Sequence, residues 1–245
     1  TGTSTVGGTS TGQITLGAAT LSDGVTLTVG AGAGTPISLS TVTGTTGSTT
    51  SNLTINTTGA ATVSGAVGTD IGTVTVTQSG GTTFNSTVSA ATITLSNSTV
   101  SSNITFSGNV TATTGLTVSA GTAAYNVVFN GSSNTIAGAT TFANTGTVTF
   151  GNGGDTIAFT SGVIATAPSQ VNIGGTVSTT NTPISIGDKA PIINTFLANS
   201  GELSYVSFGY LFVTSKSYDS LPAAITTKTS FDSAYLIASI THSLF

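Results

Sequence analysis

The chain has 245 residues, only 4% of which are charged, and its formal net charge is −4. Its cationic side chains are Lys189, Lys216 and Lys228, and it has no cysteine, so the composition excludes a basic face for nucleic acid, a disulfide framework and thiol chemistry. His242 is the single histidine, so the chain lacks the residues for a conventional nucleophile–base pair or a histidine-rich metal site. We therefore expect no enzymatic activity.

The sequence contains no methionine, and its mean hydropathy is +0.37. We therefore expect a processed chain that begins at Thr1 after removal of a secretory leader, which would place the protein outside the cell or at its surface. No apolar run approaches the roughly 20 residues of a membrane-spanning helix, so we expect no transmembrane segment.

Short strands are predicted along most of the chain by a triplet in which two apolar residues flank a threonine. Strand side chains alternate between faces, so the apolar pair would face a core and the threonine would face solvent. In chain order the clearest triplets are Ile14-Thr15-Leu16, Leu27-Thr28-Val29, Leu53-Thr54-Ile55, Val74-Thr75-Val76, Ile93-Thr94-Leu95, Ile104-Thr105-Phe106, Leu116-Thr117-Val118 and Val148-Thr149-Phe150. Looser triplets are Ile37-Ser38-Leu39, Val127-Val128-Phe129, Ile157-Ala158-Phe159, Val171-Asn172-Ile173 and Ile184-Ser185-Ile186.

The spacing of these triplets is mostly about 9 to 13 residues, the rhythm of short strands joined by turns. Helical periodicity is nearly absent, which predicts an all-β fold. Regular strands with small core residues favour a β-solenoid, or parallel β-helix, in which each turn stacks on the last. An antiparallel β-sandwich with Greek-key connections has a similar strand spacing and is the alternative.

The composition changes near Gly187, after which most of the charged and aromatic residues occur. We assign residues 1–187 to a repetitive Thr/Gly-rich strand domain and residues 188–245 to a distinct, β-rich C-terminal unit, either a cap or an assembly module. The aromatic residues that we expect in a self-assembly interface are Tyr205, Phe208, Tyr210, Phe212, Tyr235 and Phe245.

A glycine-rich segment, GNGGD at residues 151–155, is a candidate calcium site. Calcium-binding repeats follow the pattern G-G-x-G-x-D-x-U-x, in which Gly151, Gly153 and Asp155 match, although Phe150 occupies the first glycine position and no second copy adjoins. The alternative is a glycine turn between two strands, with the Asp155 carboxylate bonded to local amides.

Threonines at alternate positions also predict a surface that could order water and bind ice. Such pairs occur in Thr26-Leu27-Thr28, Thr73-Val74-Thr75 and Thr147-Val148-Thr149. The alternative is that threonine is simply a favourable outward residue on any strand.

The triplet rhythm and segments such as SNLTINTTGAATVSGAV and FGNGGDTIAFTSGVIATAPSQVNIGGTVSTTNTPISIGD resemble the repetitive strand regions of large bacterial surface proteins. These are the filamentous-haemagglutinin-like and autotransporter-associated strand-repeat proteins. The resemblance covers roughly residues 10–187. It implies a bacterial β-solenoid at the cell surface, used for adhesion or as envelope structure.

These observations together predict a secreted, non-enzymatic structural protein that assembles with its own copies into a filament or a surface layer. A nearly uncharged surface and exposed strand edges both permit strand addition between copies, so we expect a homo-oligomer without nucleic acid. The alternative function is an adhesin module that binds glycans through its polar face and tyrosine side chains.

Overall fold

The computed structural model describes residues 2–8, 12–187, 192–193 and 205–206, and within these ranges it consists of strands and turns without a helix. The first strands are β1 (Thr3–Val6), β2 (Ile14–Leu16), β3 (Ala19–Leu21), β4 (Thr26–Val29), β5 (Ile37–Leu39), β6 (Val42–Gly44), β7 (Ser51–Asn56), β8 (Ala61–Val63), β9 (Val67–Gly68), β10 (Ile71–Gln78), β11 (Thr82–Phe84) and β12 (Val88–Leu95). They are followed by β13 (Asn103–Phe106), β14 (Val110–Val118), β15 (Asn126–Phe129), β16 (Ser133–Ile136), β17 (Thr140–Thr141), β18 (Thr147–Phe159), β19 (Val163–Ala165), β20 (Gln170–Thr179), β21 (Ile184–Ile186), β22 (Ile192–Ile193) and β23 (Tyr205–Val206).

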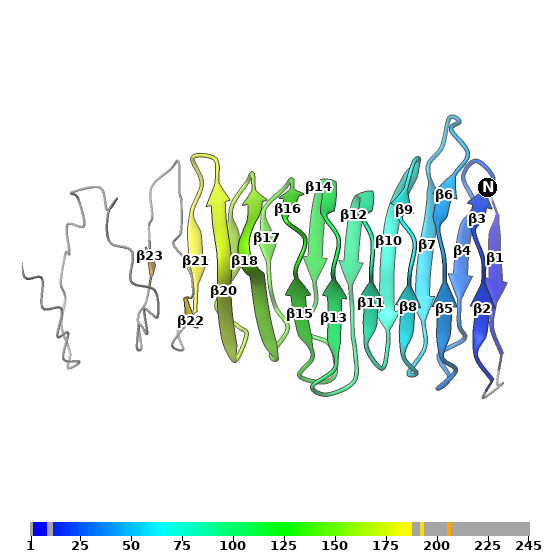
Figure 1. Ribbon diagram of the computed structural model, residues 1–245, viewed down its shortest axis with the longest axis horizontal. Coiled ribbons are helices and arrows are strands. Elements are labelled where there is room, and N and C mark those ends of the chain that lie inside the picture. The colour runs from blue at the N-terminus through cyan, green and yellow to red at the C-terminus, as the bar shows by residue number, and fades with distance from the viewer. Residues whose placement is uncertain (1, 9–11, 188–191, 194–204, 207–245) are drawn as a thin grey trace, which may run out of the picture. The chain divides into compact units, whose positions relative to one another are not determined.

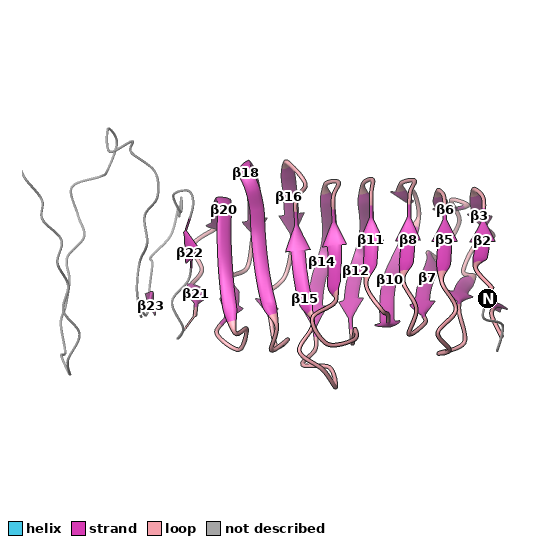
Figure 2. Ribbon diagram, turned by 60° about the horizontal axis from the view of Figure 1, so that its bottom comes forward, coloured by secondary structure: helices cyan, strands magenta, loops and turns pink. Residues whose placement is uncertain are grey.

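All pairings among these strands are parallel, and they stack successive turns of the chain on one another (Figure 1). The predicted β-solenoid is thereby confirmed, and the antiparallel sandwich is excluded. Figure 2 shows the same stack of strands after rotation, without a helix against any face.

The turns stack in three columns of strands, and each of the first three turns contributes one strand to each column. The first column begins β1, β4, β7, β10; the second begins β2, β5, β8, β11; and the third begins β3, β6, β9. From the fourth turn on, longer strands pass through a corner: β12 and β14 join the third column to the first, and β18 and β20 join the second to the third.

The length of a turn varies slightly along the stack. In the second column the paired residues are Ile14, Ile37, Ala61, Thr82, Ile104, Val127, Val148 and Val171, so successive turns take between 21 and 24 residues. Because each turn holds two or three short strands, the triplet spacing seen in the sequence is about half of the true repeat.

The core consists of apolar ladders that run along the stack. In the second column one ladder position is filled by Leu16, Leu39, Val63, Phe84, Phe106, Phe129, Phe150 and Ile173. The Phe84 and Phe106 ring centroids lie 5.0 Å apart, and those of Phe106 and Phe129 lie 5.1 Å apart, both with near-parallel rings. These distances follow from the spacing of roughly 4.8 Å between paired strands, since in-register rings must stack when the turns do.

Some corners require glycine because the chain passes directly over the backbone of the next turn. Gly30, which follows β4, has a φ of +91°, and a Cβ atom there would clash with the carbonyl oxygen of Asn56. Both the left-handed conformation and the close approach exclude larger residues at this corner.

Strand pairing continues beyond residue 187. Strands β17, β19, β21 and β23 form a four-stranded parallel sheet, and the bridge between Val118 and Phe142 joins its first strand to β14 in the first column. The chain divides into one unit at Thr1–Ser215 and another at Lys216–Phe245. Most of the predicted C-terminal unit, residues 188–245, lies outside the described residues, and the boundary at 187/188 stays a prediction.

Candidate functional site

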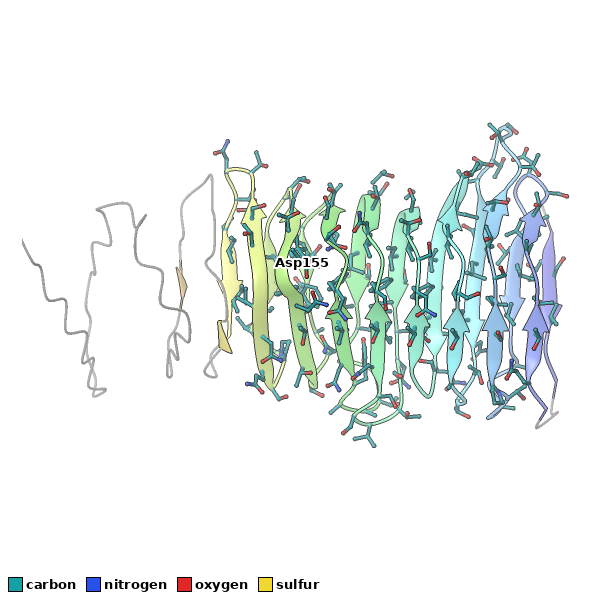
Figure 3. The ribbon with its side chains drawn as sticks, viewed as in Figure 1. Asp155 is labelled. Carbon is teal, nitrogen blue, oxygen red and sulfur yellow. The ribbon has the colours of Figure 1, made fainter. Side chains whose placement is uncertain are left out.

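The GNGGD segment forms the corner at which β18 passes from the second column to the third. Gly151, Gly153 and Gly154 have φ angles of 81°, 136° and 75°, so this corner uses backbone conformations that favour glycine. Asp155, labelled in Figure 3, is 6% exposed, and its Oδ2 atom accepts a hydrogen bond of 2.7 Å from the backbone amide of Asn152. The carboxylate therefore closes the turn locally.

This arrangement offers one carboxylate for a cation. In the part of the chain that the structure describes, no group of three or more histidine, cysteine, aspartate or glutamate side chains is placed to hold a metal ion. A calcium ion at Gly151, Gly153 and Asp155 would have to be coordinated largely by backbone carbonyls. The calcium hypothesis stays a prediction, whereas the bond from Asn152 is the local amide contact of the alternative turn.

Of the residues predicted to form a self-assembly interface, Tyr205 lies in β23, which pairs with β21. The others, Phe208, Tyr210, Phe212, Tyr235 and Phe245, lie outside the described residues, as does His242. Their role stays a prediction.

Parallel pairing brings threonines together on the outward side of the first column, in an arrangement that we call the threonine face. Its first rank is Thr3, Thr26, Asn52, Thr73 and Thr92, and its second rank is Thr5, Thr28, Thr54, Thr75, Thr94 and Thr117. The apolar residues between the ranks, such as Leu53 and Val74, are fully buried. Thus one side of each strand anchors it in the core and the other side presents hydroxyls.

Several hydroxyls of the threonine face make no hydrogen bond within the protein. Among the described residues, these are the hydroxyls of Thr28, Thr54, Thr75 and Thr94. In the first rank, the Asn52 amide donates to the Thr26 hydroxyl at 3.2 Å. Most of the second rank is therefore open to whatever lies against this face.

The second column presents a narrower outward surface. Its outward positions, one per turn, are Thr15, Ser38, Thr62, Thr83, Thr105, Val128, Thr149 and Asn172. Here the Asn172 amide donates to the Thr149 hydroxyl at 3.3 Å. The sequence grouped the Thr147–Thr149 pair with Thr26–Thr28 and Thr73–Thr75, but the pairing places it in this other column.

The sequence did not distinguish the remaining members of the threonine face, such as Thr5 and Thr117, from outward threonines elsewhere. Their triplets resemble those of the second column, and only the register between turns decides which triplets stack. A comparison of every second or third triplet, which reveals the repeat of 21 to 24 residues, could have indicated this register.

Every aromatic ring whose side chain is described lies in the interior, namely Phe84, Phe106, Tyr125, Phe129, Phe142, Phe150 and Phe159. The Tyr125 hydroxyl donates to the backbone carbonyl of Ser119 at 2.6 Å, and burial raises the pKa of this phenol. The large apolar side chains exposed in the described ranges are Val6, Val100 and Ile164. No aromatic platform for stacking on a sugar therefore occurs on this part of the surface.

A shallow groove of about 390 Å³ lies at one corner of the stack, and its lining includes Gln78, Asn97 and Thr99 beside the apolar Val100 and Ala123. Asn97 in this groove is already held by hydrogen bonds to Thr122, 2.9 Å from its amide nitrogen and 3.0 Å from its amide oxygen. Val100, which also lines the groove, is exposed. The groove contains no charged or aromatic side chain.

No family model matches the chain, and neither a curated protein nor a solved structure matches it. The described residues also contain no helix long and apolar enough to cross a membrane.

Proposed function

We propose that this protein is a non-enzymatic structural component, secreted to the cell surface, that associates with its own copies into a filament or surface layer. The observation that carries the proposal is the open edge of the first turn. Among the described residues, β1, β2 and β3 each pair on one side only, with β4, β5 and β6. Within the described stack, each of these three parallel strands thus has one edge to which no described strand is paired.

The apolar ladders reach this open end. Ile14, Leu16 and Ala19 are only partly buried, although the equivalent residues of later turns are almost fully buried, and Val6 is 37% exposed. A further turn with the same register would cover these side chains and complete the backbone pairing, as strand addition does at other sheet edges.

The hydrogen bonds identify which backbone groups are free at this edge. The Ile14 amide donates to the Pro36 carbonyl, and the Leu16 carbonyl accepts from the Ser40 amide, so residues 14 and 16 bond toward the second turn. Because bonding direction alternates along a parallel strand, the Thr15 amide and carbonyl point the other way. The amide of Thr15 is therefore a donor for an added strand.

The surface chemistry supports the same function. The charged residues of the described ranges are Asp23, Asp70 and Asp155. Net repulsion between copies is consequently weak, and a surface of hydroxyls and amides tolerates close approach of a like surface.

The proposal predicts that Thr15→Pro blocks assembly while the monomer stays folded. Proline removes the free amide of an edge strand without breaking a bond to β5, a position at which sheets tolerate it. Thr15→Ala, which keeps the amide, is the matched control and should assemble like the unchanged chain. Electron microscopy and light scattering over a concentration series measure assembly, and circular dichroism confirms the β fold of each variant.

Assemblies that Thr15→Pro leaves unaltered would contradict growth from this edge. A protein that stays monomeric at high concentration and binds defined sugars on a glycan array would instead favour the adhesin alternative. A folded Thr15→Pro variant that stays monomeric, beside a control that assembles, is the result that we expect.

A further inference from the structure

The threonine face is a two-dimensional array with fixed spacings in both directions. Along a strand, Thr73 and Thr75 are two residues apart, which corresponds to roughly 6.6 Å. Across the turns, Thr54, Thr75 and Thr94 are paired in register, which corresponds to roughly 4.8 Å between neighbours. The register in Asn52–Ile55, Thr73–Val76 and Thr92–Leu95 is uninterrupted over these four-residue segments.

The side chains of this array are restricted in conformation. Threonine is branched at Cβ, which limits its χ1 angle, and neighbouring threonines in the same rank are packed side by side. Accordingly, Thr28, Thr54 and Thr75 are half-buried although they point outward. The array therefore presents methyl and hydroxyl groups at positions that vary little.

The hydroxyls and methyls have complementary effects on water. The unpartnered hydroxyls of Thr28, Thr54, Thr75 and Thr94 can each bond a water molecule, while the adjacent methyl groups leave water few other partners. Neither rank contains a charged side chain, so no charge in the array imposes a hydration shell with a different geometry. We therefore expect water against this face to occupy regularly spaced sites.

We propose that the threonine face binds the surface of ice. A crystalline water surface is the partner that a rigid array of this kind fits, because its oxygen atoms also repeat in two directions over lengths comparable to the strand spacings. Each hydroxyl contributes little, but the fold has already fixed all of them, so little conformational entropy is lost on binding. This activity rests on the face alone and is independent of assembly through the first turn.

The residues that follow the two ranks in register show where the array of threonines ends. Thr117 is followed in register by Thr141, through the Val118–Phe142 bridge, and then by Ile164, which is 46% exposed. In the first rank Gly115 follows Thr92. The region with hydroxyls in both ranks is thus confined to β1, β4, β10 and β12, with Asn52 replacing one hydroxyl in β7.

Thermal hysteresis and ice recrystallisation measured on the full chain test this proposal, with albumin at equal concentration as the colligative control. We expect hysteresis and shaped ice crystals for the unchanged chain. Thr75→Tyr places a bulky ring in the centre of the threonine face and should lose most of this activity. Thr83→Tyr is the matched control, since Thr83 is an outward residue of the same turn in the second column.

Thr75→Ser and Thr83→Ser provide a second pair in case the tyrosine variants do not keep the β spectrum. The former removes one methyl group from the array and should lower hysteresis, whereas the latter should leave it unchanged. Absence of hysteresis and crystal shaping in the unchanged chain would overturn the proposal, and so would equal losses from substitutions in the two columns.

Discussion

Individual residues are positioned by the contrast between the inward and outward sides of each strand. The triplets predicted this contrast, and the structure confirms it in residues such as Ile104 and Phe106, which are fully buried, and Thr105 between them, which is not. The sequence also predicted small core residues, and this holds for the first turns. Leu16, Leu39 and Val63 occupy the ladder position that phenylalanine fills later.

Phe106 is a residue whose truncation should clearly destabilise the stack. Its ring lies between those of Phe84 and Phe129, so Phe106→Ala would leave a cavity and remove two stacking contacts. We expect a loss of about 3–5 kcal/mol in the free energy of unfolding, as for other buried phenylalanines. Equilibrium unfolding in guanidinium chloride measures it.

Thr105→Ala is the control for that measurement, because the outward neighbour should change stability by roughly 0.5 kcal/mol or less. Phe106→Leu should fall between the two, since leucine fills the same ladder position at Leu39. Equal losses for Phe106→Ala and Thr105→Ala would show that the ladder does not hold the turns together.

At the scale of elements, the corners and the hydrogen bonds across them decide how one turn meets the next. The sequence offered a calcium site or a turn at GNGGD, and the structure shows a corner within one strand, with a register shift between Phe150 and Asp155. The local sequence could not distinguish the two, because positive φ angles and a bonded carboxylate are features of both.

Asp23 is a second carboxylate that accepts backbone hydrogen bonds at a corner, and it joins the corner after β3 to the loop that precedes β7. Its carboxylate accepts from the Thr49 amide at 2.8 Å and the Ser48 amide at 3.1 Å, and the bond from Thr49 is the main cause of its lowered pKa. The contact should therefore stabilise the protein above the unfolded-state pKa of about 3.9 and fade as the pH falls through the lower folded-state value.

Comparing the unchanged chain with Asp23→Asn measures this effect. The unfolding midpoint of the unchanged chain should be higher near pH 6, and the difference should shrink as both are acidified toward pH 2, about two units below the reference carboxyl value. Because Asp23 is exposed, we expect a small difference. A difference that grows on acidification would contradict the assignment.

At the scale of the whole described stack, stability should vary along the chain because each turn contacts only its neighbours. The first turn is paired on one side, whereas β13, for example, is paired with both β11 and β15. In unassembled protein, amide hydrogen exchange read by mass spectrometry should therefore be fast in residues 12–21 and slow in residues 103–106. Uniform protection along the chain would contradict this prediction.

The sequence predicted the all-β class and the solenoid from strand spacing and small core residues, but it could not align the turns. Turns of 21 to 24 residues differ enough that no single period superimposes all of the triplets. Hydrogen-bond register between distant segments is a tertiary property, which is why the sequence predicted threonine pairs but only the structure showed which of them stack into the threonine face.

The variable turn length has a consequence for how the number of turns can change in evolution. Because ladder positions repeat while corner lengths do not, a whole turn, such as the one from Thr82 to Asn103, is an interchangeable module whose loss or duplication would join equivalent residues. Descendants of such a chain can lengthen or shorten by duplication or deletion of a turn without having to redesign their interior.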